Sequence, residues 1–391
     1  MVPPVQQWID GNLNVGQIQE VKIEDLLDRA PIQIDNPVLQ NELDGKVILI
    51  TGAAGSIGSE IANQISNYSY KHLILLDQAE SDLYDLQQIF IRNKVKDFTV
   101  ELADIRNEQR LNNIFKKYKI ELIFHAAAYK HVPLMENNPY EAVRVNIYGS
   151  SLLMKFAIKY GIQKFVMVST DKAVNPTNVM GATKRVAEIF ANCLNTESKT
   201  KFVTTRFGNV LGSNGSVIPL FKRQIENGGP LTVTHKEITR FFMTIPEACQ
   251  LVLEAGVMGN GGEVYVFDMG ESVKIFDLAK KMIHLSGMQY PDDIDIEISG
   301  LRPGEKLYEE LLTSEENTIP TYHDKIMIAK TENINIKKIK QQIEELISVH
   351  EISNMEIVSK LKSIVPEYIS NNSEFEKLDG EKGKVKKLNV S

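Results

Sequence analysis

The sequence predicts an α/β protein with a doubly wound parallel sheet and a smaller C-terminal substrate lobe. From Lys46 to Arg206, short apolar runs alternate with segments of helical spacing, and a glycine-rich turn joins the first run to the first helix. After Arg206 this alternation loosens. Strands that alternate with helices of about 10–15 residues build a parallel sheet covered on both faces. We therefore expect right-handed crossovers and a ligand crevice at the carboxyl ends of the strands.

Six apolar runs are predicted as strands, in the order Val47–Ile50, His72–Asp77, Phe98–Leu102, Leu122–His125, Lys164–Val168 and Lys201–Thr205. Helical segments lie between them, at Ile57, Ile61 and Ile65, over Ser81–Ile91, and around Leu111–Tyr118, Tyr140–Tyr160 and Thr183–Cys193. Apolar residues three or four positions apart line one face of a helix, so each helix can cover the sheet.

The chain divides into four predicted regions. Residues 1–44 form a proline-punctuated arm with one short amphipathic segment, Ile23–Leu27, and residues 45–210 form a dinucleotide-binding domain. Residues 211–365 form mainly a substrate-binding lobe, with some segments that return to the first domain. They contain isolated elements at Ile245–Ala255, Val264–Phe267 and Ile275–Leu285 and an amphipathic helix at Ile336–Val349. Residues 366–391, rich in Glu, Lys, Gly and Asn towards the end, are expected to be a flexible tail.

The composition argues against several classes of protein. A net charge of −7 makes nucleic acid an unlikely main partner in this prediction. The two cysteines lie far apart in the sequence and the seven histidines form no ligand pattern, so neither a disulfide framework nor a metal site is expected. No signal peptide and no apolar run of membrane-spanning length is found in the sequence given. The chain is therefore predicted to be cytoplasmic.

A phosphate-binding turn is predicted between the first strand and the first helix. Gly52, Gly55 and Gly58 recur every third residue around Ser56 and Ile57. The first glycine permits a tight turn, the second lets the backbone approach a pyrophosphate, and the third lets helix and strand pack closely. A glycine-rich turn without a ligand is the alternative. The position between strand and helix favours the cofactor.

Acidic residues follow the second and third strands. Asp77 ends the second strand, 19 residues after Gly58, where its carboxylate can accept hydrogen bonds from a ribose 2′-hydroxyl and repel a 2′-phosphate. This favours NAD over NADP, although a solvated aspartate at a strand end is the alternative. Asp104 and Ile105 follow the third strand, where the carboxylate can meet the adenine amino group.

Several separated motifs together resemble the extended short-chain dehydrogenase/reductase superfamily. They are the glycine turn, His125-Ala126-Ala127-Ala128-Tyr129-Lys130, Ser169-Thr170-Asp171-Lys172-Ala173 and Gly181-Ala182-Thr183-Lys184. The Thr-Asp-Lys triplet is similar to that of nucleotide-sugar 4,6-dehydratases. The segments Arg206–Ser213 and Leu301–Lys306 look like those of UDP-N-acetylglucosamine dehydratases of bacterial polysaccharide biosynthesis.

The resemblance covers roughly Asp44 to Lys330. It implies a Rossmann domain, NAD as the cofactor, Ala126, Ala127 and Ala128 among the cofactor contacts, and a homo-oligomer. The arm Val2–Asp28 is similar to the linker of longer, membrane-anchored members, so Met1 marks either a short natural form or a truncation.

The reaction implied by the resemblance converts UDP-N-acetylglucosamine to a 4-keto-6-deoxy sugar. A hydride leaves C4, a proton leaves C5, water leaves C6, and the hydride returns to C6. Lys172 is implied as the C5 base, provided that burial or a cationic neighbour lowers its pKa. Asp171 is implied as the acid towards the C6 hydroxyl, Thr170 as a contact to the C4 oxygen, and Lys184 as a contact to the nicotinamide ribose.

Met180 occupies the position at which related enzymes have a tyrosine, four residues before Lys184. A thioether carries no proton to exchange. By resemblance, methionine here indicates the C5-retaining subgroup, which gives the xylo-hexulose product, and a packing role is compatible with that assignment. The acceptor of the C4 hydroxyl proton stays open between Thr170, water and the Lys184–ribose chain.

Substrate contacts are also implied by resemblance. Asn209 would meet the pyrophosphate or the sugar, and Arg240 and Arg302 suit bidentate phosphate contacts, although surface ion pairs are the alternative for both. The remaining predicted substrate-site residues are Lys130 and Glu305, together with Tyr129, His131 and Glu136, which would shape the hexose pocket.

Two other functions compete with the dehydratase. A nucleotide-sugar 4-epimerase shares the fold and the first hydride step, but it needs neither a C5 base nor a C6 acid. A non-catalytic NAD-binding scaffold would explain Met180 but not the presence of Thr170, Asp171, Lys172 and Lys184.

Overall fold

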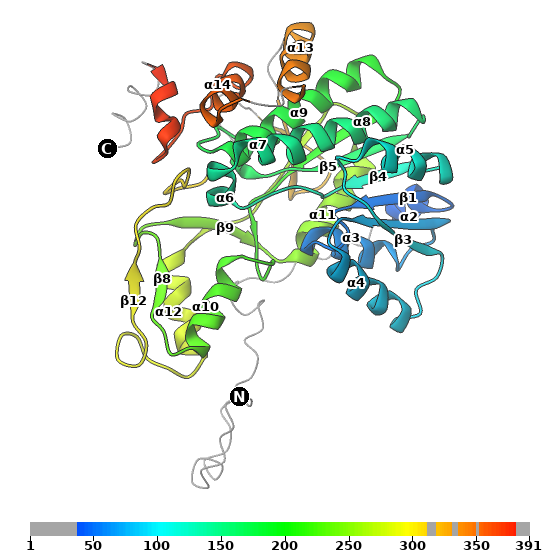
Figure 1. Cartoon of the computed structure of the whole chain (residues 1–391). Coiled ribbons are helices and arrows are strands. Elements are labelled where there is room, and N and C mark those ends of the chain that lie inside the picture. Colours follow the sequence, from blue (N-terminus) through cyan, green and yellow to red (C-terminus); the bar gives the residue numbers. More distant parts are fainter. Residues whose placement is uncertain (1–36, 311–317, 331–334, 349–351, 381–391) are drawn as a thin grey trace.

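A nine-stranded sheet forms the centre of the computed structural model, which describes residues 37–310, 318–330, 335–348 and 352–380 (Figure 1). The six predicted strands are present, as β1 Val47–Thr51, β2 His72–Asp77, β3 Phe98–Leu102, β4 Leu122–His125, β5 Lys164–Val168 and β6 Lys201–Arg206. Three further strands complete the sheet, namely β10 Val264–Phe267, β13 Thr318–Pro320 and β14 Ile326–Ala329.

The strand order is β13-β14-β10-β6-β5-β4-β1-β2-β3. Strands β1 to β6 and β10 pair in parallel, whereas β13 and β14 are antiparallel additions at one edge. The chain leaves β1 towards β2 and β3, and returns on the other side to β4. In a parallel sheet the ligand crevice lies at this reversal, outside the carboxyl ends of the strands. The doubly wound prediction is confirmed.

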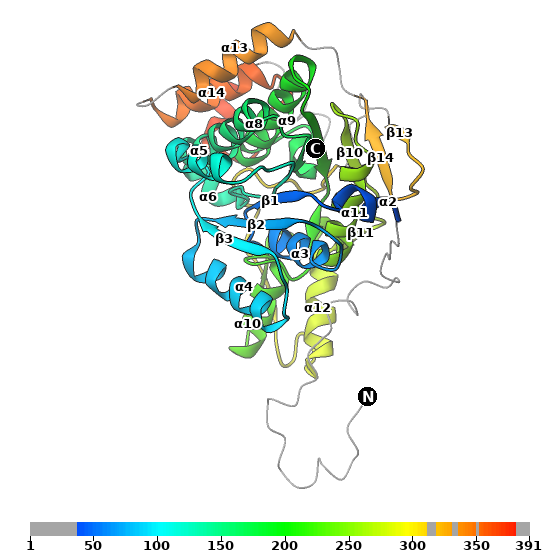
Figure 2. The same cartoon turned by 90° about the vertical axis from the view of Figure 1, so that its right-hand side faces the viewer.

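Helices cover both faces of the sheet, as the two views show (Figures 1 and 2). One face carries α5 Glu108–Lys117, α8 Ser150–Lys159, α9 Val179–Glu197, α13 Ile336–Ile347 and α14 Asn354–Ile364. The other carries α2 Pro37–Leu43, α3 Ser56–Ile65, α4 Glu80–Arg92 and α11 Ile245–Met258. Short helices α6 Val132–Asn137 and α7 Pro139–Ala142 and a π-helical turn Val143–Gly149 lead into α8. Because both faces are covered, the strands read as nearly continuous apolar runs.

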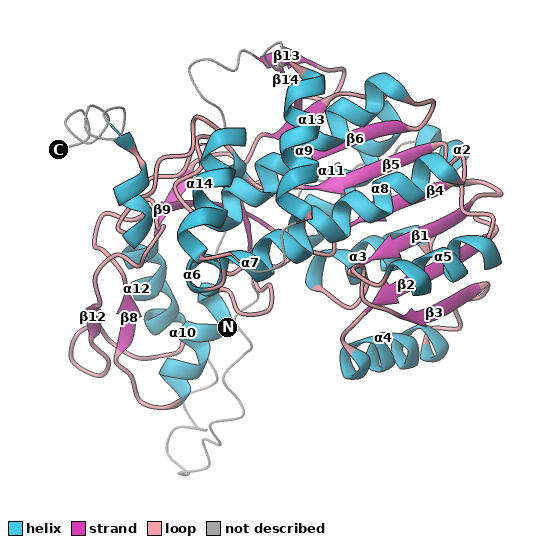
Figure 3. Cartoon of the chain, turned by 45° about the horizontal axis from the view of Figure 1, so that its top comes forward, coloured by secondary structure: helices cyan, strands magenta, loops and turns pink. Residues whose placement is uncertain are grey.

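A smaller lobe lies beyond the sheet and has its own apolar core (Figure 3). It consists of α10 Val217–Glu226, α12 Ile275–Leu285 and two small sheets. One sheet has the order β11-β9-β7, with β7 Asn209–Val210, β9 Thr239–Met243 and β11 Ser272–Lys274. The other pairs β8 Leu231–Val233 with β12 Ile296–Ile298.

Two elements of the region 211–365, β10 and α11, pack on the main sheet. All four residues of β10 are buried, and the strand pairs with β6 and β14. Helix α11 packs on α3 and on strands β5 and β6. Both elements are strongly apolar and are stable only where other elements cover them. The large sheet and its helices provide that cover.

The prediction of a flexible tail from residue 366 is wrong for residues 366–380. Tyr368 and Phe375 are buried in the main core, and the short helix Glu374–Leu378 follows α14. Lys362 of α14 bonds to Asp379, to Ser370 and to the Tyr368 carbonyl, which fixes the segment. The polar composition of this segment gave no sign that Tyr368 and Phe375 would be buried in the core. Residues 1–36, including Ile23–Leu27, and residues 381–391 lie outside the described residues.

Candidate active site

A cleft at the switch point is lined by the residues predicted for the cofactor. Its walls come from the glycine turn, from the ends of β2, β3 and β4, and from Asn214 of the lobe, and include Gly52, Gly55, Asp77, Asp104, Ile105, Ala126, Ala127 and Ala128. Ser56, at the start of α3, accepts a hydrogen bond from the Asn214 backbone amide (3.2 Å), so the lobe meets the turn here. The topology therefore brings these predicted residues together.

Packing requires two of the three glycines. Gly52 has φ +69°, and a Cβ on it would lie 2.5 Å from the Ala127 amide nitrogen. A Cβ on Gly58 would lie 2.0 Å from the Gly52 carbonyl oxygen. A Cβ on Gly55 would meet only that same oxygen, at 3.3 Å, so Gly55 leaves its backbone open towards the cleft. This cradle fits a dinucleotide, because each glycine has the role that the phosphate-binding turn requires.

Gly58→Ala should weaken NAD binding at least tenfold and destabilise the fold by about 1–3 kcal/mol, because the new methyl group forces α3 away from the turn. Calorimetric titration with NAD and urea unfolding measure the two effects. Asn63→Ala, on the exposed side of the same helix, is the control. Unchanged NAD affinity in Gly58→Ala would show that the turn does not hold the cofactor.

The two acidic residues of the cleft differ in their surroundings. Asp77 accepts hydrogen bonds from the backbone amides of Ala54 and Ala79, both at 3.0 Å, and so stiffens the turn. Asp104 is held by the Arg106 guanidinium at 2.7 Å. Burial raises the pKa of Asp104, but the hydrogen bonds from Arg106 outweigh burial and lower it. Both carboxylates line the cleft, and the Asp104 carboxylate is paired there with the Arg106 guanidinium.

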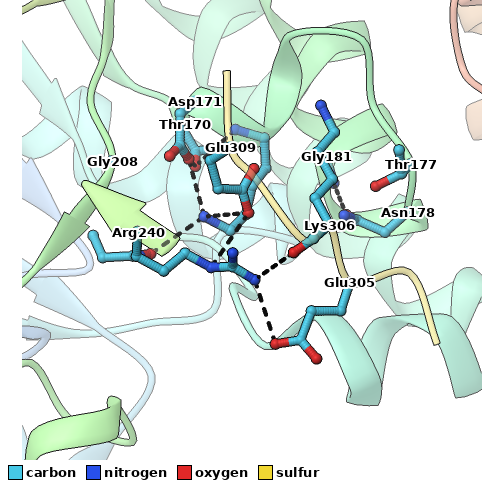
Figure 4. Close-up of polar contacts among 12 residues, drawn as sticks. Thr170, Asp171, Thr177, Asn178, Gly181, Gly208, Arg240, Glu305, Lys306 and Glu309 are labelled. Atoms are coloured by element: carbon cyan, nitrogen blue, oxygen red, sulfur yellow. Dashed lines mark hydrogen bonds and ion pairs between the residues drawn. The ribbon is translucent and has the colours of Figure 1, made fainter. Parts of the chain in front are cut away.

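The predicted catalytic triplet follows β5: Thr170 caps a short 3-10 turn, Asp171–Ala173, which contains Asp171 and Lys172. The Thr170 hydroxyl donates to Asp171 Oδ1 (2.9 Å). Lys172 Nζ donates to the same oxygen (3.0 Å) and to Asn209 Oδ1 (3.2 Å). Figure 4 shows this group from the side of Arg240. The side chain of Asp171 is fully buried and that of Lys172 is 16% exposed, so the pair is held in a low-dielectric site.

The charges in this group favour protonated forms. Burial raises the pKa of Asp171, and the nearby Glu309 carboxylate raises it further, against the opposing effect of Lys172. Burial lowers the pKa of Lys172, but Asp171 and Glu309 outweigh burial and the net shift is upward. The predicted acid therefore has the environment it needs. The condition set for Lys172, a lowered pKa, is not met in the resting protein.

Glu309 was not predicted from the sequence. Its carboxylate lies 3.5 Å from Lys172 Nζ and 3.7 Å from Arg240 Nε. It is 137 positions from Lys172, in a stretch with a second glutamate beside it, and no local pattern distinguishes the two. The Asp171-Lys172 sequence after a strand suggests at most that some further carboxylate lies nearby. It does not say which residue provides that carboxylate.

Met180 and Lys184 lie on the first turns of α9. Met180 is 4% exposed and packs in the main core, which agrees with a packing role. Lys184 Nζ donates to the Val168 carbonyl (2.7 Å), and burial lowers the pKa of Lys184 to about 8. A Cβ on Gly181 would lie 2.1 Å from the Lys172 carbonyl oxygen, so glycine after Met180 lets α9 approach the catalytic turn.

The predicted substrate contacts divide into two groups. Asn209 lies in the catalytic group, and Lys130 and His131 lie near the lobe, with Lys130 Nζ 3.5 Å from Ser213 Oγ. Arg240, by contrast, donates to the carbonyls of Thr239 (2.7 Å) and Lys306 (2.9 Å). It also pairs with Glu305 and Glu309, so we assign it to the protein framework. Arg302 is 58% exposed and is the better placed of the two arginines for a phosphate.

Glu136 does not shape a hexose pocket. Its carboxylate accepts hydrogen bonds from the Val179 amide (2.6 Å) and the Ser373 hydroxyl (2.8 Å). It therefore satisfies the N-terminus of α9 and ties it to the C-terminal segment. The Gly304 amide in turn donates to the Asn371 carbonyl (2.7 Å), so the same segment fixes the loop that carries Arg302 and Glu305.

Within the described residues, no group of His, Cys, Asp or Glu has the arrangement of a metal site. In the same ranges, no helix is both long enough and apolar enough to cross a membrane.

Comparison with known proteins identifies the family. The family model described as polysaccharide biosynthesis protein matches residues 48–331. The chain belongs to this family. Among its curated relatives is the capsular polysaccharide biosynthesis protein CapD of Staphylococcus aureus, 50% identical over 89% of this chain and 58% of CapD. The chain thus spans less than two thirds of the length of that relative.

Relatives in this family include two kinds of enzyme. A UDP-N-acetylglucosamine 4,6-dehydratase (inverting) of Campylobacter jejuni is 34% identical over 70% of this chain and 79% of the relative. A UDP-glucose 4-epimerase of Rickettsia bellii is 36% identical over 69% of this chain and 79% of the relative. Identity alone does not separate these activities.

The solved structures confirm the predicted fold. Pen from Bacillus thuringiensis is 33% identical, covers 80% of this chain and 99% of its own, and superposes with a TM-score of 0.69. The resemblance to extended short-chain dehydrogenases/reductases is thereby confirmed for this member of the polysaccharide biosynthesis protein family.

Proposed function

We propose that this protein is an NAD-dependent UDP-N-acetylglucosamine 4,6-dehydratase that retains the C5 configuration and acts in surface polysaccharide biosynthesis. The observation that carries the proposal is the buried Asp171–Lys172 pair at the carboxyl end of β5. An elimination of water needs an acid and a base held together, and this pair would supply both at the end of the strand next to β4, whose own end lines the cofactor cleft.

The glycine turn and Asp77 would hold NAD, in agreement with the cradle at Gly52 and Gly58. When bound, NAD would supply the hydride chemistry at C4 and C6 of the sugar. Lys184, buried and donating to the Val168 carbonyl, is placed on α9 to reach the nicotinamide ribose. A solved dTDP-glucose 4,6-dehydratase of Streptomyces venezuelae with NAD bound shares this fold, with a TM-score of 0.60.

The proton steps fall to the residues after β5. Asp171, kept protonated by burial, would protonate the C6 hydroxyl so that it leaves as water. Lys172, once it has lost its own proton, would take the C5 proton and would return a proton to C5 when the hydride is added at C6. Activity should therefore require a pH at which Lys172 can lose its proton. Thr170 would contact the C4 oxygen, since its hydroxyl bonds to Asp171. The assignment to the C5-retaining subgroup is supported by the resemblance at Met180, and its packing in the core agrees with a residue that exchanges no proton.

A nucleotide-sugar 4-epimerase is the second candidate, and the identity to the Rickettsia bellii enzyme favours it. An epimerase returns its hydride to C4 and eliminates nothing, so a buried acid next to a lysine has no role in it. The loss of water separates the two proposals.

Incubation of the protein with UDP-N-acetylglucosamine and NAD, without added reductant, should give a product lighter by one water. Mass spectrometry checks the loss, and NMR of the product formed in deuterated water gives the C5 configuration. An unchanged mass would reject the dehydratase, and conversion to the C4 epimer would establish the second candidate. An L-arabino product would reject retention at C5 but not the elimination.

A further inference from the structure

Glu309 joins the catalytic turn to the lobe. One of its oxygens lies between Lys172 Nζ (3.5 Å) and Arg240 Nε (3.7 Å). Figure 4 shows the Glu309 side chain next to Arg240. The Glu309 side chain is 3% exposed. Its other oxygen, Oε2, and Asp171 Oδ2 are both buried without a hydrogen-bond partner among the described residues. Two carboxylates thus share one ammonium group and each has an unused oxygen.

The charged groups nearest this pair of carboxylates come from the catalytic turn and from β9. The groups that face Asp171 and Lys172 are each other, Glu309 and, from β9, Arg240. Arg240 also pairs with Glu305 (3.4 Å), and Lys306 adds a weaker attraction to Glu309 while it pairs with the more exposed Glu310. Asp171 and Glu309 therefore share the Lys172 ammonium group, while Arg240 divides its charge between Glu309 and Glu305. When both Asp171 and Glu309 are ionised, two buried carboxylates repel each other across one ammonium group, which a low-dielectric site disfavours.

We propose that Glu309 is a positioning residue for the catalytic pair: its charge holds Asp171 in the acid form, and its carboxylate fixes the Lys172 ammonium group beside Asp171 and Asn209. This inference rests on the proposed dehydratase function. It assigns the protonation of the acid to a residue from a separate loop of the chain rather than from the catalytic turn. Without the Glu309 charge, the Lys172 ammonium group would pair with the Asp171 carboxylate alone, and Asp171 would ionise more readily.

The test replaces Glu309 by glutamine, which keeps the shape and removes the charge. Loss of a negative neighbour lowers the pKa of both Asp171 and Lys172, since it favoured the protonated form of each. Both limbs of the pH profile of kcat should therefore move to lower pH, by about 1–3 pH units. Glu310→Gln, which removes the adjacent carboxylate outside the cluster, should leave the profile in place. A lower kcat at an unmoved pH optimum in Glu309→Gln would overturn the proposal, because a merely structural defect gives that result.

A second measurement needs no turnover. Infrared spectra of the wild-type protein at neutral pH should show a protonated carboxyl band that is absent in Asp171→Asn and is lost in Glu309→Gln. A band that persists in Glu309→Gln contradicts the proposal. If the wild-type protein eliminates no water, the dehydratase function fails while this spectrum still decides the role of Glu309. If Glu309→Gln does not fold, Glu309→Asp, which withdraws the charge by one methylene, should shift the pH optimum downward by less, and an unmoved optimum again contradicts the proposal.

Discussion

Lys172→Ala should abolish the loss of water from UDP-N-acetylglucosamine, with a decrease in kcat of about 10³-fold or more. The substitution removes the proposed C5 base, and it also removes the ammonium group that lies between Asp171 (3.0 Å) and Glu309 (3.5 Å). General acid–base groups contribute about 10²–10⁴-fold by proton transfer alone, and two buried carboxylates left without their cation add a further cost. Mass spectrometry of the product over time gives the rate.

Met180→Leu is the informative comparison for this experiment. Met180 is buried in the main core, and a volume-conserving swap of this kind usually costs less than about 1.5 kcal/mol. This variant should therefore keep most of the activity. Equal and total loss in Lys172→Ala and Met180→Leu would mean that the methionine does more than pack. Full activity of Lys172→Ala would remove the lysine from the mechanism.

Arg206→Met should destabilise the protein by about 3–5 kcal/mol, because it removes the fully buried cation of the Glu188 carboxylate and leaves only the more exposed Arg185 (3.2 Å) beside it. Arg206 and Glu188 are each about 1% exposed and lie 2.6 Å apart. The same carboxylate accepts a hydrogen bond from Ser169 (2.6 Å), the residue that precedes Thr170. The Arg206–Glu188 pair is thus linked through Ser169 to the catalytic turn. Urea unfolding measures the decrease in stability.

The matched control removes both charges. In the double variant Arg206→Met with Glu188→Leu, most of the stability should return, because no uncompensated charge stays in the core. If the double variant loses as much stability as the two single variants together, the pairing is contradicted. Burial raises the pKa of Glu188, but Arg206 outweighs burial and lowers it to about 2. The contribution of Glu188 to stability is thus complete above the ordinary carboxyl pKa and is lost as the pH falls towards 2.

The main domain could be predicted because its signals are local. Each of the six strands is an apolar run that ends at a turn, and the observed strands agree with the predicted ones to within one residue. The glycine turn carries its own explanation, since Gly52 and Gly58 meet backbone atoms at distances that no side chain tolerates. The helix at Ile336–Val349 was also correct, as α13, because its apolar residues recur at helical spacing.

The predictions were wrong where they relied on local composition or position and the side chain makes its contacts with distant parts of the chain. The polar segment after residue 366 is fixed by Tyr368 and Phe375, two aromatic side chains whose burial depends on α9 and α14 lying nearby. Glu136 was assigned to the hexose pocket because it follows β4, yet it turns to the N-terminus of α9. In both cases the deciding contact comes from a distant part of the chain.

The sequence by itself determined the sheet, the cofactor turn and the presence of Thr170, Asp171 and Lys172 after β5, because periodicity, turn chemistry and motif spacing act over a few residues. Only the tertiary structure decided the electrostatic surroundings of that triplet. Glu309 and Arg240 reach it from separate elements of the chain, 137 and 68 positions from Lys172. Electrostatic energies depend on distance in space and on burial, and neither can be read from the order of residues.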